Sequence, residues 1–302
     1  MKSTAAQNDH VLRLIADAIR PILQEADSEA VQAAVSSSSR VKEFQGGVSQ
    51  LMVGFLNLNP YADEKAEPNT SYGYPSTTLP SVDEQIARQL AGIPGLSDIQ
   101  AVKVEYRDAS SVGTDGLMAI PFLTDLGRLL GIEDPLGAGY GTLGEKVLEG
   151  IDSTRRFYNY RKGELGSDYV RLNAEAREKL QALESKAAPE EGKLRFHILP
   201  VSMGKSLQGY SPRNALCTAL LSNRLPLGFV QIGCTLLGWP ERLTAYEQMF
   251  VDCPADEYNW DARGVWAYCP YFCFDDDELG LFAYDAVTAY EYYGSPVASL
   301  GV

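Results

Sequence analysis

The fold is decided by residues 265–284, which read VWAYCPYFCFDDDELGLFAY. Two apolar and aromatic runs flank four consecutive acids in this stretch, Asp275, Asp276, Asp277 and Glu278. Runs of this composition are typical of β-strands, and a short polar connection between two of them predicts a β-hairpin. We therefore expect the C-terminal end of the chain to be rich in strands, with a hairpin that has an acidic tip.

Outward from this hairpin, the periodicity of the sequence predicts an α+β protein. Apolar residues at helical spacing predict helices over 9–25, 28–35, 81–90, 143–162, 168–187, 211–223 and 240–247. Residues 102–106 and 194–199 are expected to be strands, and residues 229–237 a buried strand or a buried helix. Helices and strands do not alternate regularly, so we expect a mixed or mainly antiparallel sheet instead of a doubly wound parallel one.

Capping signals fix the start of three of these helices. Ser81 with Glu84 forms a capping-box pattern, and Ser211 precedes Pro212 as an N-cap precedes a proline at the first helical position. Ser167 is the expected cap of the helix over 168–187.

The N-terminal part of the chain is expected to be a helical region over residues 1–58. Within it, segments 40–45 and 48–58 flank two glycines, which is compatible with a hairpin, although the second segment could also be a helix. Residues 59–80 contain four prolines and no apolar periodicity, so they are either a linker or a surface excursion. The main α+β domain would then span 81–302, and a single domain overall is also compatible with the sequence.

The charge of the chain limits its partners. Its 40 acids and 26 bases give a formal charge of −14, and this disfavours general binding to nucleic acid or to anionic membranes. Residues 253–302 alone hold nine acids, one base and twelve of the thirty aromatic residues. A protein partner with a basic face is the natural complement of such a region.

The sequence indicates a soluble protein in a cytoplasmic compartment. Its longest uncharged apolar run, residues 225–240, contains two prolines and three glycines and is too short to span a bilayer. The first 27 residues lack the cleavage pattern of a signal peptide. The five cysteines, an odd number in apolar surroundings, suit reduced and buried thiols.

No motif predicts a cofactor or a metal. Gly139, Gly141 and Gly144 match the spacing of a dinucleotide-binding loop, but no buried strand leads into the first glycine. The acidic tip of the hairpin lacks two oxygen ligands of a calcium loop, and Cys269 and Cys273 are too far apart on a strand to share a metal. We predict neither a cofactor nor a metal.

Residues 155–162 form a basic patch in which four basic residues, including Arg155 and Arg156, interleave with three aromatic ones. This composition could bind a single-stranded nucleic acid by stacking and phosphate contact, which the overall acidity makes improbable. The patch could also be a helix end with arginines along an apolar surface. In a third interpretation it docks against the acidic C-terminal region, within the chain or on a neighbouring copy.

Two functional hypotheses remain. In the first, the protein is not an enzyme and acts as an assembly subunit or adaptor, through self-association or a protein partner. Its binding residues would be Arg155, Arg156, Trp260, Trp266, Asp275, Asp276, Asp277 and Glu278, with segment 59–80 as a second contact element. In the second, Asp256, Glu257 and Asp261 are the carboxylates of a hydrolase that acts on a carbohydrate, with Trp260 and Trp266 as sugar platforms. We favour the first hypothesis because no catalytic motif is present.

Overall fold

The computed structural model of the chain describes residues 5–37, 41, 59–69, 71–74, 78–106, 109–111 and 113–300. The chain divides into two compact units, Met1–Ser49 and Gln50–Val302, which are described one by one. The hairpin that the sequence suggests around Gly46 and Gly47 lies outside the described residues.

The first unit contains two helices, α1 (Ala5–Glu25) and α2 (Ser28–Ser36). Val11, Ile15 and Ile19 follow one another at four-residue spacing on α1 and are the less exposed of its described side chains. Between the two helices, a carboxylate oxygen of Asp27 accepts a hydrogen bond of 2.7 Å from the backbone N–H of Glu29 and caps the start of α2. Both helices were predicted, and α1 begins four residues before its predicted start.

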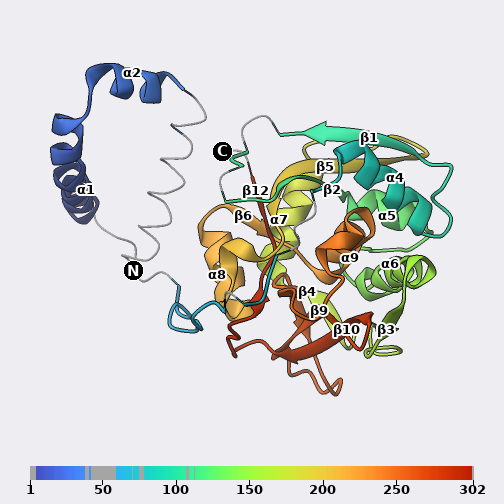
Figure 1. Ribbon diagram of the computed structural model, residues 1–302. Coiled ribbons are helices and arrows are strands. Elements are labelled where there is room, and N and C mark those ends of the chain that lie inside the picture. The colour runs from blue at the N-terminus through green and yellow to red at the C-terminus, as the bar shows by residue number, and fades with distance from the viewer. Residues whose placement is uncertain are drawn as a thin grey trace. The chain divides into compact units, whose positions relative to one another are not determined.

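The second unit is an α+β fold with two mixed sheets (Figure 1). The first sheet has the order β1-β5-β12-β6, with β2 also paired to β5, and the second has the order β11-β7-β9-β10-β3, with β8 paired to both β9 and β4. The strands are β1 (Gln100–Glu105), β2 (Gly116–Pro121), β3 (Phe157–Asn159), β4 (Val170–Leu172), β5 (Lys193–Ser202), β6 (Arg224–Pro226), β7 (Phe250–Asp252), β8 (Asp256–Tyr258), β9 (Tyr268–Asp275), β10 (Glu278–Asp285), β11 (Tyr293–Gly294) and β12 (Val297–Ser299). The helices of this unit are α4 (Val82–Gly92), α5 (Leu123–Leu129), α6 (Tyr140–Thr154), α7 (Ala174–Glu184), α8 (Pro212–Leu221) and α9 (Phe229–Gly238), with short 3-10 turns at Lys205–Leu207 and Pro240–Arg242.

The core forms around α9, which resolves the ambiguity over residues 229–237 in favour of a helix. All ten residues of α9 are buried, and Figure 1 shows the helix between the two sheets. Although α9 is strongly apolar, no helix in the described part of the chain is both long and apolar enough to cross a membrane.

Gly141 and Gly144 of α6 are glycines because neighbouring segments pack closely against them, and not because they bind a phosphate. A Cβ atom on Gly141 would lie 1.4 Å from the carbonyl oxygen of Leu165, and one on Gly144 would lie 2.0 Å from Cζ of Phe229. Contacts this short cannot exist, so only glycine lets α6 approach α9 and the loop before β4. The spacing that imitates a dinucleotide-binding loop therefore has a structural cause.

The predicted helix starts at Ser81 and Ser211 are confirmed. The Ser81 hydroxyl accepts a hydrogen bond of 3.3 Å from the N–H of Glu84, and the Ser211 hydroxyl accepts one of 3.2 Å from Asn214. The prediction for Ser167 is wrong. Asn173 caps α7 instead, and residues 170–172 form strand β4, because pairing with β8 outweighs the helical pattern there.

The predicted C-terminal hairpin is present as β9 and β10. The two strands pair antiparallel with Asp275 opposite Glu278, which leaves Asp276 and Asp277 as the turn. Both turn residues have positive φ, 49° and 60°, as a two-residue turn of type I′ requires. The first strand begins at Tyr268, three residues later than predicted, and the turn is two residues shorter than the acidic run.

A buried ion pair fastens α5 to the central strand β5 of the first sheet. The Arg195 guanidinium donates hydrogen bonds of 2.5 Å from Nε and 2.9 Å from Nη2 to the carboxylate of Asp125. Both side chains are buried, so each charge depends on the other for its stability in the interior.

Candidate functional site

Aromatic side chains gather on one face of the second sheet, and we call them the tyrosine cluster. The cluster comprises Tyr72, Tyr158, Tyr160, Tyr246, Phe250, Tyr271, Phe282, Tyr284, Tyr290, Tyr292 and Tyr293. Strand alternation explains why the members on β9 and β10 share a face, since Phe272 and Leu281 point from these strands into the main core while Tyr271 and Phe282 point the other way. The rings run across the sheet in strand order, from Tyr293 on β11 to Tyr158 on β3.

The centre of the tyrosine cluster is buried and its margin is exposed. Phe250 is 8% exposed and lies 5.1 Å from Tyr293 between ring centroids, whereas Tyr158 and Tyr246 at opposite margins are 50% and 51% exposed. At one margin Tyr160 stacks on Phe282, with 3.9 Å between ring centroids. The cluster is therefore anchored in the fold and open at both margins.

Segment 59–80 contributes to this cluster through Tyr72. The Tyr72 ring stacks on Tyr292 with centroids 4.8 Å apart, and it also contacts Tyr246 and Phe250. The segment is held on the second unit by backbone hydrogen bonds from Asn69 to Glu291 and from Gly73 to Glu247. These contacts join the described part of the proline-rich segment to Glu247 and to the C-terminal region.

Asp252 is buried beneath the cluster. One carboxylate oxygen accepts a hydrogen bond of 3.2 Å from the Tyr284 hydroxyl, and the other accepts one of 3.3 Å from Ser295. Burial raises the pKa of Asp252 well above its usual value, and the hydrogen bonds from Tyr284 and Ser295 oppose this rise. Asp252 therefore holds Tyr284 against the interior through this hydrogen bond.

Acidic side chains border the tyrosine cluster at both margins. The pKa of Tyr160 is raised mainly by partial desolvation and, to a smaller extent, by the negative charges of Glu278 and Asp276. At the other margin the pKa of Tyr72 is raised to about 12. The largest cause is a hydrogen bond with Tyr246, and burial and the charge of Glu247 add to it. These phenols stay protonated at neutral pH and can donate hydrogen bonds, while the acids supply negative charge.

The two arginines of the basic patch have different surroundings. Arg155 is partly buried at the end of α6 and donates hydrogen bonds of 2.8 Å to the carbonyl of Pro240 and 3.0 Å to that of Leu243. Arg156 is exposed and lies 3.8 Å from Glu278, since β3 pairs with β10. The predicted helix over 143–162 thus ends at Thr154, and the patch meets the acidic hairpin within the chain.

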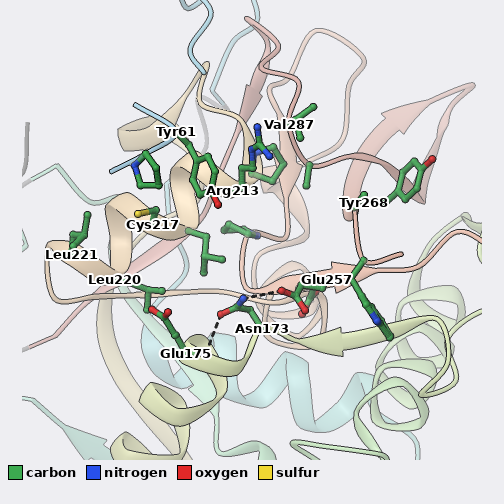
Figure 2. Close-up of a pocket in the computed structure, with 18 residues that line it drawn as sticks. Tyr61, Asn173, Glu175, Arg213, Cys217, Leu220, Leu221, Glu257, Tyr268 and Val287 are labelled. Atoms are coloured by element: carbon green, nitrogen blue, oxygen red, sulfur yellow. Dashed lines mark hydrogen bonds between the residues drawn. The ribbon is translucent and has the colours of Figure 1, made fainter. Parts of the chain in front are cut away.

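A pocket of about 640 Å³ lies elsewhere on the second unit (Figure 2). Leucines 216, 220 and 221 of α8 line one side, the start of α7 and strand β8 line the floor, and aromatic residues that include Trp266 and Tyr268 line another side. Figure 2 shows Asn173 between Glu257 and Glu175 on the floor, with hydrogen bonds to both.

The three carboxylates of the hydrolase hypothesis have separate environments. Asp256 borders the pocket but is buried, and its oxygens accept hydrogen bonds of 2.7 Å from the Tyr140 hydroxyl and 2.6 Å from the N–H of Phe229. Glu257 is the next residue of strand β8, so its side chain points to the opposite face. Asp261 is exposed and pairs with Arg263 at 3.3 Å. The structure does not bring two of these carboxylates to face each other across the pocket.

The two tryptophans of the prediction also separate. Trp266 lines the pocket, and its ring lies 3.9 Å from the guanidinium carbon of Arg171. Trp260 is exposed outside the pocket, where Arg161 lies 4.1 Å from its ring centroid. Neither belongs to the tyrosine cluster.

Sequence reasoning missed several members of the tyrosine cluster. Phe250, Tyr246 and Tyr72 lie outside the last fifty residues, and Tyr158 and Tyr160 were assigned to a helix end. One available signal was the density of tyrosine in residues 290–293, where three of four residues are tyrosine. Such density next to acids is unusual for a core.

Comparison with known proteins gives no family for this chain. No protein-family model, no curated protein and no solved structure matches it. Among the described residues, no group of three or more histidine, cysteine, aspartate or glutamate side chains could hold a metal ion.

Proposed function

We propose that this protein works through contacts with another protein, as an assembly subunit or adaptor, and that the tyrosine cluster is its contact surface. One observation carries the proposal. Tyr72 from the proline-rich segment stacks on Tyr292 from the C-terminal region, so the two elements that the sequence singles out form one surface.

The composition of the cluster supports this proposal. Tyrosine combines a large apolar area with a hydroxyl donor and loses little conformational entropy on binding, so it is enriched at interfaces and among their strongest contributors. Phe250 and Tyr293 give the surface a rigid centre, while Tyr158 and Tyr246 leave apolar area open to solvent at the margins. An aromatic centre with a charged margin is the usual anatomy of a protein interface.

The charge of the margin favours a basic partner over a second copy of the chain. Asp275, Asp276, Asp277 and Glu278 lie at one margin and Glu247 and Glu291 at the other, and all but Glu278 are exposed. Two such margins would repel each other in a symmetric dimer. A lysine- or arginine-rich face gains both charge attraction and cation–π contacts with exposed tyrosine rings.

Native mass measurement of the protein purified from its own cells tests the proposal. We expect a retained protein partner that is lost when the exposed rings are removed in Tyr158→Ser/Tyr246→Ser. Leu117→Ser is the matched control, because Leu117 is 49% exposed but lies on β2, a strand of the first sheet. Its replacement should leave the partner bound.

A second variant tests the charge of the margin. Glu247→Lys/Asp275→Lys should weaken the complex, and added salt should weaken the wild-type complex as well. A protein that remains monomeric and retains no partner, or a partner that stays bound to Tyr158→Ser/Tyr246→Ser, would contradict the proposal.

A further inference from the structure

The geometry points to a second binding site: the pocket beside α8, which we propose binds a neutral saccharide without cleaving it. Its volume of about 640 Å³ lies in the range of small-ligand sites. Every residue that lines it belongs to the second unit, and none belongs to the tyrosine cluster. The inference is thus independent of the proposed protein contact.

Trp266 is the platform of this site. The guanidinium carbon of Arg171 lies 3.9 Å from the centroid of the indole ring, and Arg171 does not itself line the pocket, so a cation from outside the pocket holds in place a ring that borders it. Tyr268 lies two residues further along the same segment and lines the pocket too. A fixed aromatic surface suits the C–H face of a sugar ring, which is apolar and flat, and stacks on it with little loss of entropy.

The polar groups of the floor are held in place before any ligand binds. Glu257 accepts hydrogen bonds of 2.7 Å from Arg171 and 2.9 Å from Asn173. A carboxylate has about four lone-pair positions, so Glu257 can accept further bonds from ligand hydroxyls. On the opposite side, Arg213 is bound to Glu64 and keeps the plane of its guanidinium fixed. Planar donors and acceptors of this kind match the paired hydroxyls of a sugar.

The charges of the pocket favour a neutral ligand. Arg213 is its single basic lining residue among those described, and its charge is balanced by Glu64. Glu257 is likewise balanced by Arg171. Glu175 has no ion pair within the described part of the chain, and its negative charge disfavours anionic sugars.

The site is suited to binding and not to hydrolysis. Hydrolysis of a glycosidic bond needs two carboxyl groups on either side of it. Here the carboxylate of Asp256 accepts hydrogen bonds from Tyr140 and Phe229 in the interior. The other two carboxylates of the pocket, Glu257 and Glu175, both lie on its floor beside Asn173, so they would not lie on opposite sides of a bound glycosidic bond. The ligand should therefore leave the pocket unchanged.

The test uses the full chain and a panel of neutral oligosaccharides: maltotriose, cellotriose, chitotriose, mannotriose and galactobiose. Saturation-transfer NMR and titration of tryptophan fluorescence report binding, and at least one member should bind saturably. Trp266→Ala should weaken that binding about tenfold or more, because the stacking surface is lost. Trp260→Ala should leave it unchanged, because Trp260 is exposed outside the pocket.

Trp266→Tyr keeps an aromatic platform and should retain most of the affinity, which separates stacking from any general effect of the alanine variant on folding. The inference would be overturned if no member of the panel saturates up to about 10 mM, or if Trp266→Ala and Trp260→Ala bind equally well. Binding of spermidine or of an oligolysine peptide in this pocket, without saccharide binding, would also overturn it. None of these outcomes bears on the protein contact proposed above.

Discussion

The hydroxyl of Tyr140 donates a hydrogen bond of 2.7 Å to a carboxylate oxygen of Asp256, where α6 meets strand β8. Both side chains are buried, and burial, which hydrogen bonds only partly offset, raises the pKa of Asp256 from 3.8 to about 7. Between these two values the folded protein keeps a proton that the unfolded chain releases. The free energy of unfolding should therefore fall as the pH rises from about 4 to about 7.

This pH dependence is the first prediction. Each unit of pKa difference corresponds to about 1.4 kcal/mol, so Asp256→Asn, which cannot ionise, should show a shallower fall in unfolding free energy between pH 4 and 7. Urea unfolding at several pH values measures the difference. Asp261→Asn is the control, because Asp261 is exposed and should leave the slope unchanged. Equal slopes for wild type and Asp256→Asn would disprove the assignment.

The second prediction separates the two arginines of the basic patch. Arg155→Ala removes two hydrogen bonds that join the end of α6 to the carbonyls of Pro240 and Leu243, and it leaves these acceptors unpaired. We expect a loss of about 1–3 kcal/mol in unfolding free energy. Arg156→Ala should change it by less than about 0.5 kcal/mol, because Arg156 is 71% exposed. Chemical denaturation measures the unfolding free energy of both variants. Equal losses in the two would contradict the prediction.

The third prediction concerns the contact between α6 and α9. In Gly144→Ala the new methyl group would overlap the ring of Phe229, so we expect destabilisation of about 1–3 kcal/mol even though alanine favours a helix. Gly166→Ala is the matched control, since no atom lies within 4 Å of the corresponding position. The midpoint of thermal unfolding should fall for the first variant and hold or rise for the second.

The fourth prediction concerns the turn of the C-terminal hairpin. Asp277 has a φ of 60°, where a β-branched residue is strained and glycine is not. Asp277→Val should lower the unfolding free energy by about 1–2 kcal/mol, and Asp277→Gly should leave it equal or slightly higher. Calorimetry of the two variants checks the order, and the reverse order would mean that the turn has another conformation.

Local signals in the sequence predicted much of the fold. The caps at Ser81 and Ser211 and the C-terminal hairpin each depend on a few neighbouring residues, and each is present. Prediction failed where a distant strand decided the outcome. Residues 170–172 carry a helical pattern, yet they pair with β8 from more than eighty residues away. The α+β class could be predicted because it depends on the sum of many local signals.

The candidate sites were less predictable, because both depend on contacts between distant segments. Tyr72 and Tyr292 are separated by more than two hundred residues, and nothing in either neighbourhood indicates that they stack. Similarly, the pocket combines Trp266 with leucines of α8. The opposite orientation of Asp256 and Glu257 was in principle readable, since consecutive residues of a strand always point to opposite faces. To predict this orientation, residues 256–258 would first have had to be recognised as a strand.

The position of β12 in the first sheet has a consequence for the order in which the chain can fold. β12 spans Val297–Ser299 and lies between β5 and β6, so it joins two strands that are made much earlier. During synthesis, β5 and β6 must wait for residue 299 to leave the ribosome before this part of the sheet can close. Such late, long-range pairing slows folding and leaves strand edges exposed in the meantime. Until β12 has been synthesised, the edges of β5 and β6 that it joins therefore stay unpaired.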